Sequence, residues 1–219
     1  TALEKKGFEQ PSPIQLETIP MLLANTHDLI GHAQTGTGKT AAFGLPILES
    51  LDPTSGPIQA LVLTPTRELT IQVSDELHSL KGKKNLTITP VYGGQSIMNQ
   101  KKQLKKRNDI IVGTPGRLID HLKSKNLDLS HIKYLVLDEA DEMLNSGFIE
   151  DIELILSKTN ADRRTLLFSA TMPKPILSLA NRYMGDYKTI NIKKETLATT
   201  LTEQIYFELR ESDKLEALC

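Results

Sequence analysis

The sequence predicts an α/β fold in which a parallel sheet lies between two layers of helices. Three observations support this prediction. Short runs rich in leucine or β-branched residues alternate with helical stretches, most of these runs are apolar on both faces, and each run ends in a turn of small residues. Ligands of such sheets bind beyond the carboxyl ends of the strands. The residues that follow each run are therefore the candidates for a functional site.

Composition narrows the class of protein. The chain has 219 residues, of which 39% are hydrophobic, enough for a buried core. No apolar run approaches the roughly 18 residues that cross a membrane, and the N-terminus lacks the apolar core of a signal peptide, so no membrane partner is expected. The single cysteine, Cys219, excludes an internal disulfide framework and fits a cytoplasmic location. A net charge of −1 does not by itself predict nucleic-acid binding.

The predicted elements follow one another in a regular order. A short helix closed by Gly7 comes first, and a second helix begins near Pro13 and continues through Leu23. Seven apolar runs are predicted to be strands, at residues 28–31, 60–63, 87–91, 109–112, 134–137, 165–168 and 189–192. A polar linker is predicted at 193–202, then a strand at 203–209 and a helix capped by Ser212. We therefore expect one domain over residues 1–192 and, over 193–219, a linker and the start of a second domain.

A glycine-rich stretch follows the first strand and opens a helix. Its residues are Ala33, Gln34, Thr35, Gly36, Thr37, Gly38, Lys39 and Thr40. Gly36 and Gly38 allow backbone N–H groups to face a triphosphate, Lys39 adds a positive charge, and the hydroxyl that follows it can bind Mg²⁺. Ala33 stands where the usual phosphate-loop pattern has its first glycine. A flexible glycine–threonine turn is the alternative, but it gives no reason for Lys39 and Thr40 at the start of a helix.

Carboxylates follow the fifth strand, in the segment Asp138, Glu139, Ala140 and Asp141. Asp138 can hold Mg²⁺, partly through water, and Glu139 can orient or deprotonate an attacking water. A phosphate loop about 100 residues upstream makes this a predicted site of triphosphate hydrolysis. The alternative is a helix start that carries acidic residues because of the helix dipole.

Two hydroxyl side chains follow the sixth strand, at Ser169 and Thr171. We expect these hydroxyls to bond to the carboxylates of Asp138 and Asp141 at the neighbouring strand end. Such bonds would connect the nucleotide site to the outer rim of the sheet. An ordinary turn or helix cap is the alternative.

Three further turns follow strands. They contain Pro65, Thr66 and Arg67; Gly93 and Gly94; and Thr114, Pro115, Gly116 and Arg117. Helix-start amides, hydroxyls and two arginines suit a phosphate backbone and do not require a net positive charge. Taken singly, each turn is also explained as a plain strand-to-helix connection. The lysine-rich stretch 101–107 is interpreted as a solvated helix face on which Leu104 alone marks the buried side.

Gln15 is the candidate for recognising a base. Its side-chain amide can both donate to and accept from the N6/N7 edge of adenine. A surface glutamine without a ligand is the alternative.

Taken together, these motifs resemble the N-terminal RecA-like domain of DEAD-box ATP-dependent RNA helicases over essentially the whole chain. Gly7, Phe8, Pro11, Ile14 and Gln15 are similar to the adenine-reading Q motif of the family. The stretch 33–40 is similar to its phosphate loop, in which alanine is the family's own usage. The three turns resemble its RNA-backbone motifs, residues 138–141 the acidic motif that names it, and residues 169–171 the element that couples hydrolysis to unwinding.

The resemblance implies a RecA-like P-loop NTPase domain that uses ATP and Mg²⁺. It implies an RNA helicase that couples ATP binding and hydrolysis to local unwinding, with RNA bound through its backbone and without sequence specificity. Lys39, Asp138 and Glu139 would then be catalytic. Asp141, Ser169 and Thr171 would couple hydrolysis to unwinding. An ATP-gated RNA clamp is the alternative function, and a DNA helicase or another P-loop ATPase is a third.

The resemblance also implies a second RecA-like domain of the same chain, expected after Cys219. In the family this domain supplies arginines to the γ-phosphate and the other half of the RNA site. An arginine finger contributes about 10³–10⁵ in rate to related phosphoryl transfers. Residues 1–219 alone are therefore expected to bind nucleotide, to hydrolyse it very slowly and not to unwind duplexes. The adenine-stacking aromatic residue that the family carries upstream of the Q motif is not in this sequence, so nucleotide affinity is expected to be lower.

Overall fold

The computed structural model describes residues 2–24, 27–192, 208–210, 213–214 and 217. The predicted linker at 193–202, residues 203–207 of the strand predicted after it, and Ser212 lie outside the described residues. The division into one domain and the start of a second therefore stays a prediction.

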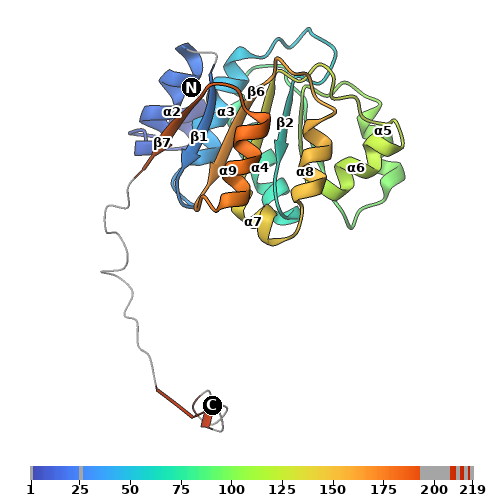
Figure 1. The fold of residues 1–219 in the computed structure, drawn as a ribbon. Helices are drawn as coiled ribbons and strands as arrows, with labels where there is room; N and C mark the ends of the chain where they lie inside the picture. The colour runs from blue at the N-terminus through green and yellow to red at the C-terminus, as the bar shows by residue number, and fades with distance from the viewer. Residues whose placement is uncertain (1, 25–26, 193–207, 211–212, 215–216, 218–219) are drawn as a thin grey trace.

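Within the described residues, seven strands form one sheet in which every neighbouring pair is parallel (Figure 1). The strands are β1 (Asp28–His32), β2 (Ala60–Leu63), β3 (Ile88–Val91), β4 (Ile110–Gly113), β5 (Tyr134–Asp138), β6 (Arg164–Ser169) and β7 (Tyr187–Asn191). Their order across the sheet is β3-β4-β2-β5-β6-β1-β7. All of them lie at the predicted runs, so the predicted parallel sheet is confirmed.

The strand β7 begins earlier than predicted, at Tyr187 rather than at Thr189. It pairs with β1 along its whole length, from Tyr187 opposite Asp28 onwards. Lys188 and Thr189 are nevertheless exposed, and Ile190 is the buried residue of the strand. An edge strand need not be apolar on both faces, so the pattern that marks the central strands is absent here.

Helices cover both faces of the sheet (Figure 1). They are α1 (Ala2–Lys5), α2 (Pro13–Ala24), α3 (Lys39–Ser50), α4 (Arg67–Leu80), α5 (Ile97–Leu104), α6 (Pro115–Lys123), α7 (Ala140–Asn145), α8 (Ile149–Leu156) and α9 (Lys174–Tyr183). Buried side chains of α2, α3 and α4 join one core cluster, and those of α5 to α9 join another. None of the described helices has the length and apolar character needed to cross a bilayer.

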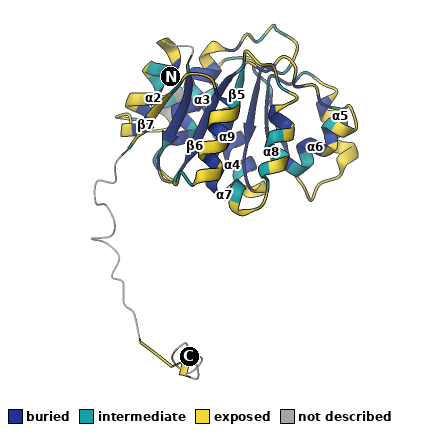
Figure 2. Cartoon of the chain, in the orientation of Figure 1, coloured by how far each residue is buried: buried dark blue, intermediate teal, exposed yellow. Residues whose placement is uncertain are grey.

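The strands divide their side chains between these two clusters. In β2, Ala60 and Val62 belong to the cluster under α2, α3 and α4, whereas Leu61 and Leu63 belong to the cluster under the other helices. Figure 2 shows the result: buried strands lie between helices whose outer sides are exposed. The predicted three-layer α/β architecture is confirmed.

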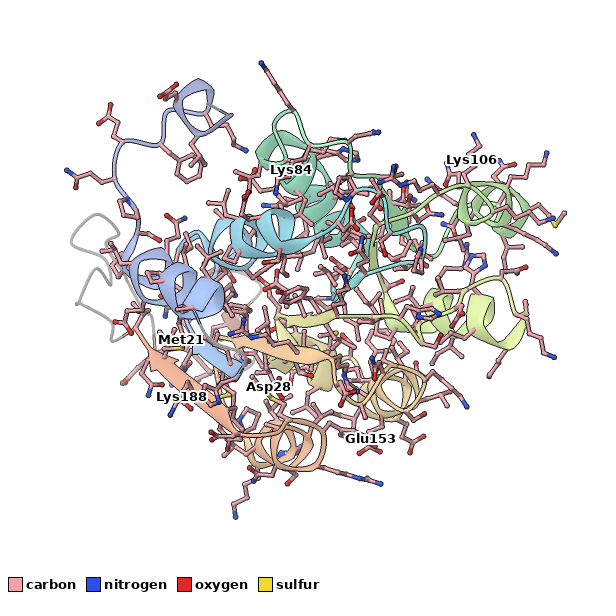
Figure 3. The ribbon with its side chains drawn as sticks, turned by 90° about the horizontal axis from the view of Figure 1, so that it is seen from above. Met21, Asp28, Lys84, Lys106, Glu153 and Lys188 are labelled. Carbon is pink, nitrogen blue, oxygen red and sulfur yellow. The ribbon has the colours of Figure 1, made fainter. Side chains whose placement is uncertain are left out.

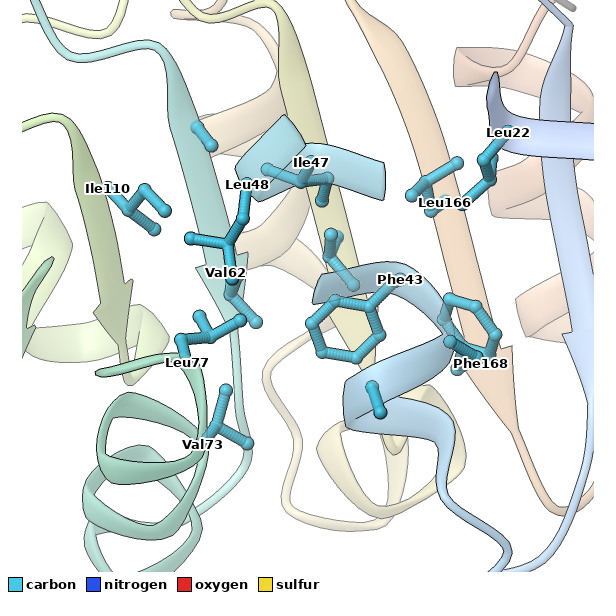
Figure 4. Close-up of a cluster of buried hydrophobic side chains, with 14 of the residues drawn as sticks. Leu22, Phe43, Ile47, Leu48, Val62, Val73, Leu77, Ile110, Leu166 and Phe168 are labelled. Carbon is cyan, nitrogen blue, oxygen red and sulfur yellow. The ribbon is translucent and has the colours of Figure 1, made fainter. Parts of the chain in front are cut away.

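Two phenylalanines anchor the start of α3 on the sheet (Figure 4). Phe43 of α3 and Phe168 of β6 are fully buried, and their ring centroids lie 5.4 Å apart. Gly31 of β1 lies against the ring of Phe168, where a Cβ atom would overlap the ring. This packing fixes α3 against the end of β1, and it thereby fixes the position of the loop between them.

Candidate functional site

The strand order sorts the predicted site residues into two groups. β5, β6 and β1 are neighbours, so the carboxylates, the hydroxyls and the phosphate loop that follow these strands lie side by side. β3, β4 and β2 are neighbours too, so the three turns predicted to bind RNA also lie together. We call these groups the β5-β6-β1 half and the β3-β4-β2 half of the site. They meet where β2 pairs with β5.

The predicted phosphate loop lies between β1 and α3. Gly36 and Gly38 have positive φ angles of 83° and 87°, which glycine adopts without strain. Gln34 and Thr35 are exposed, whereas Ala33 is buried. No side chain caps the first turn of α3, whose N-cap is Gly38. The unpaired N–H groups of that turn are therefore available to an anion.

Lys39 and Asp138 form a buried pair beneath this loop. Lys39 is 6% exposed and Asp138 is 2% exposed, and Lys39 Nζ lies 3.8 Å from Asp138 Oδ1. Neither atom has a hydrogen bond to any described residue. Burial raises the pKa of Asp138 to about 6, against the opposing effect of the Lys39 charge. Buried charges without hydrogen bonds are costly, and phosphate oxygens at Lys39 and Mg²⁺ at Asp138 would supply the missing partners.

Glu139 reaches the phosphate loop from β5. Thr35 Oγ1 donates a hydrogen bond to Glu139 Oε1 at 2.9 Å. The φ of Glu139 is 54°, in the left-handed region that costs about 1–2 kcal/mol for a residue with a side chain. The carboxylate of Glu139 thus lies against the phosphate loop, and its predicted role toward an attacking water stays a prediction.

The predicted link between the ends of β5 and β6 is partly confirmed. Thr171 donates two hydrogen bonds to Asp141 Oδ2, from its backbone N at 2.9 Å and from Oγ1 at 2.8 Å. Ser169 Oγ accepts from Asp141 N at 3.2 Å. The predicted bonds from these hydroxyls to Asp138 are wrong, because Asp138 still belongs to β5 and lies against Lys39. Asp141 instead lies in the first turn of α7, beside the end of β6.

This link predicts a pH-dependent effect of Thr171→Val. Burial acts to raise the pKa of Asp141, but the hydrogen bonds that Thr171 donates to its carboxylate, together with the interaction with Ser169, outweigh burial and hold that pKa below its ordinary value. The stabilisation that these bonds provide is therefore present at neutral pH and lost as the pH falls through the lowered pKa. We expect Thr171→Val to reduce the free energy of unfolding by about 1 kcal/mol at pH 7 and by less at pH 3.5.

Urea unfolding at the two pH values measures this effect. Thr159→Val is the matched control, because Thr159 Oγ1 donates to a neutral acceptor, the carbonyl of Leu156, at 2.8 Å. The cost of the control substitution should be the same at both pH values. Equal costs of Thr171→Val at pH 7 and pH 3.5 would contradict the prediction.

Gln15 is buried and bonded to the phosphate loop, so the alternative of a surface glutamine is wrong. It is 5% exposed, and its Nε2 donates to the carbonyl of Gly38 at 3.2 Å. Its Oε1 accepts from Ser12 N at 3.0 Å, and Ser12 Oγ donates to the carbonyl of Thr37 at 2.7 Å. Ser12, which directly precedes α2, thus also contacts the phosphate loop. The contact of Gln15 with adenine stays a prediction.

The arginines of the β3-β4-β2 half are held in place by the turn after β3. The guanidinium of Arg67 lies over the ring of Tyr92, 5.1 Å from its centroid. Arg117 Nη1 donates to the carbonyl of Gln95 at 3.0 Å. Thr66 caps α4 by accepting from Leu69 N at 3.2 Å. The turn after β3 is thus in contact with each of the other two predicted turns.

Gln100 is a residue of this half that sequence reasoning missed. It is 1% exposed, its Nε2 donates to the carbonyl of Tyr92 at 2.9 Å, and its Oε1 accepts from Arg117 at 3.0 Å and from His121 at 3.1 Å. Within the lysine-rich stretch 101–107, Leu104 is the one buried residue, as predicted, and Gln100 extends the buried side of α5 in front of that stretch. The signal was present, because residues 100 and 104 are four apart and share one face of a helix.

Residues 12–179 match the family of DEAD/DEAH box helicases. The chain belongs to this family. The whole of this DEAD-box chain is 52% identical, over 218 residues, to a probable ATP-dependent RNA helicase of Methanocaldococcus jannaschii, of which it covers 58%. It is also 52% identical, over 217 residues and 99% of its length, to the DEAD-box ATP-dependent RNA helicase CshA of Geobacillus kaustophilus, of which it covers 46%.

Solved structures agree with these relatives. The DEAD-box chain superposes with a TM-score of 0.85 on the crystal structure of a DEAD box protein from the hyperthermophile Methanococcus jannaschii, with 51% identity over 100% of this chain and 58% of that chain. The TM-score is 0.80 for a hypothetical ATP-dependent RNA helicase from Sulfolobus tokodaii, with 38% identity over 87% of this chain and 55% of that one. The predicted RecA-like fold is confirmed. The DEAD-box chain spans about half the length of the curated relatives it matches.

Proposed function

We propose that the protein is an ATP-dependent RNA helicase and that this chain holds the site for ATP and Mg²⁺ and one half of the RNA site. One observation carries the proposal: Lys39 Nζ and Asp138 Oδ1 are buried together, 3.8 Å apart, without hydrogen bonds to described residues. Family membership and the printed names of the relatives support it. The single cysteine supports a cytoplasmic location.

The β5-β6-β1 half would bind the nucleotide. The N–H groups of the loop at Gly36 and Gly38 and those of the first turn of α3 would face the phosphates, and Lys39 would pair with their negative charge. Thr40 and Asp138 would hold Mg²⁺, partly through water. When bound, Mg²⁺ offsets the negative charge of the phosphate oxygens.

Glu139 is the proposed acceptor of a proton from the attacking water. Thr35 already donates to its Oε1, which leaves Oε2 to orient a water. The backbone of Glu139, with a φ of 54°, turns its side chain toward the phosphate loop. This role is a catalytic one, because the carboxylate would contact a reacting atom.

The bonds of Asp141 with Ser169 and Thr171 are the proposed coupling element. They tie the segment that carries Asp138 and Glu139 to the end of β6. A displacement of the Asp138 and Glu139 carboxylates on hydrolysis would therefore also move the end of β6. The proposed partner on that side is a second RecA-like domain.

The β3-β4-β2 half would bind the RNA backbone. Thr66 and Thr114 stand at the starts of α4 and α6, where unpaired N–H groups suit phosphates. Arg67 and Arg117 add positive charge at the same edge of the sheet. Such contacts carry no sequence information, so binding would be independent of RNA sequence.

Unwinding is the test of the proposed function. Residues 1–219 would be joined to the part of the Methanocaldococcus jannaschii relative that the chain does not cover, and we call this protein the chimaera. Release of a short labelled RNA duplex per ATP hydrolysed is then measured. Release coupled to hydrolysis would support the helicase, whereas long-lived retention of RNA without release would favour the ATP-gated clamp. Stronger stimulation of the ATPase by DNA than by RNA would favour a DNA helicase.

Gln100 supplies a prediction for the RNA half. We expect Gln100→Leu to weaken binding of single-stranded RNA to the chimaera about tenfold, because Arg117 and His121 lose their common acceptor. Gln100→Glu keeps that acceptor and should remain within about threefold of the parent affinity. Fluorescence anisotropy of labelled RNA measures both variants. Nucleotide affinity should not change in either variant, and a parallel loss of nucleotide binding would contradict the assignment of Gln100 to the RNA half.

A further inference from the structure

A groove with an apolar floor lies between α6 and α8. Its volume is about 460 Å³. Its apolar lining consists of Ile119, Leu122, Leu127, Leu129 and Leu154. Leu154 of α8 is 38% exposed, so part of this lining is open to solvent. The groove lies at the C-terminal end of α6, roughly 12 Å from the helix start that we assign to RNA.

Three lysines form the rim of this groove. Lys123 ends α6, Lys125 follows it, and Lys158 follows α8, so both walls carry positive charge. All three are exposed, and within the described part of the chain none of their ammonium groups has an ion pair or a hydrogen bond. The one acidic residue of the lining, Asp128, accepts a hydrogen bond from Ser130 N at 2.9 Å. Three lysines against this one aspartate leave the residues that line the groove with a net positive charge.

The acidic residue beside Leu154 in sequence does not neutralise the rim. Glu153 accepts a hydrogen bond from Arg182 of α9 at 2.9 Å and is not among the residues that line the groove. The outer face of α8 is thus divided, with one side paired to α9 and the other side open toward the lysines.

Lys125 occupies a backbone position that favours glycine. Its φ is 52°, and Glu139 is the only other described non-glycine residue with a positive φ. Lys125 N donates to the carbonyl of Leu122 at 3.0 Å, and Asn126 N donates to the carbonyl of His121 at 2.9 Å. This pair of bonds is the helix end at which glycine is the preferred residue. A lysine at this position lowers the free energy of unfolding relative to glycine. It also places on the rim a positive charge that has no partner among the described residues.

We propose that the groove binds an acidic amphipathic helix of a protein partner. An apolar stripe of the partner would cover Leu122 and Leu154, and carboxylates on both sides of that stripe would pair with the lysines of the two walls. Grooves between packed helices accept the apolar face of a third helix, and the rim selects for negative charge. An RNA backbone would use the charge but would leave the apolar floor uncovered. The proposal does not depend on ATP hydrolysis.

The test begins with selection of 16-residue helical peptides, displayed on phage, against residues 1–219. Enriched peptides should carry apolar residues at helical spacing with Asp or Glu on both sides of the stripe. Labelled synthetic copies should lose at least tenfold in affinity with Leu154→Asp and with Lys158→Glu. Lys188→Gln is the matched control on β7, which Figure 3 shows well apart from Glu153 of α8, and it should leave affinity unchanged.

Several outcomes would overturn the proposal. The first is enrichment of neutral or basic peptides. The second is peptide affinity that is unchanged by both Leu154→Asp and Lys158→Glu. The third is displacement of the bound peptide by oleate at the same concentration as the peptide. Nucleotide-dependent thermal stabilisation is measured on the same variants. Intact stabilisation together with absent peptide binding overturns this proposal alone and leaves the proposed ATP site standing.

Lys125→Gly separates binding from folding. It should raise the midpoint of urea unfolding, because glycine fits the left-handed backbone, and it should weaken the peptides at least threefold. A gain in stability with unchanged peptide affinity would overturn the role of the lysine rim.

Discussion

Replacing Lys39 with alanine is expected to abolish the stabilisation that ATP and Mg²⁺ give to the chain. A ligand present at 100 times its Kd stabilises the folded state by about 2.7 kcal/mol, which for a chain of this size is roughly 5–10 °C in Tm. Lys39 Nζ is buried beneath the phosphate loop and has no hydrogen bond to a described residue. Its removal takes away the positive charge that the phosphates would meet.

The measurement is the Tm with and without ATP and Mg²⁺ for each protein. The difference matters more than the Tm itself, because Lys39→Ala also leaves Asp138 buried without its partner at 3.8 Å and lowers the Tm of the free chain. Lys188→Ala, on the exposed edge strand β7, is the control and should keep the full shift. A normal shift in Lys39→Ala would refute the assigned phosphate site.

Replacing Glu139 with glutamine is expected to lower ATP turnover by about 10²–10⁴-fold while ATP binding is retained. Glutamine has nearly the same size and still offers an oxygen to Thr35 Oγ1, which donates to Glu139 at 2.9 Å. It cannot accept a proton from water. The two readouts should therefore separate, with a normal thermal shift and a lost reaction.

The rate is measured in the chimaera under single-turnover conditions, so that slow product release does not hide the chemical step. Glu142→Gln is the control, because Glu142 lies in α7, the helix that Glu139 precedes, and is exposed. It should turn over at the parent rate. Turnover of Glu139→Gln at that rate would remove Glu139 from the mechanism.

Much of the fold and of the candidate site could be predicted from local sequence patterns. The central strands are apolar on both faces, a pattern typical of parallel sheets that helices cover on both sides. The phosphate loop combines two glycines with Lys39 and Thr40 within one short stretch. Glu139 and Asp141 could be assigned to the site because they directly follow such a strand. The start of β7 was predicted two residues too late, because Lys188 is exposed at the edge of the sheet and breaks the apolar pattern.

The remaining features depend on contacts between distant segments. The pairing of Asp138 with Lys39 rather than with Ser169 depends on which face of β5 the last residue occupies. Gln100 directly precedes the lysine-rich stretch, whose composition indicates a solvated helix face. Its hydrogen bonds to Tyr92 and Arg117 form only when α5 lies against the turn after β3 and the first turn of α6. Strand order is likewise a property of the whole chain, which local periodicity does not encode.

The position of β1 in the sheet has a consequence for synthesis of the protein on the ribosome. β1 pairs with neither β2 nor β3, the strands that follow it in the sequence. Its neighbours are β6 (Arg164–Ser169) and β7 (Tyr187–Asn191). β1 therefore has no neighbouring strand until the segments that form β6 and β7 have also been synthesised. Pairings of such large sequence separation are slow to form. The phosphate loop, although translated before β2 to β7, is among the last parts of the described domain to acquire its supporting sheet.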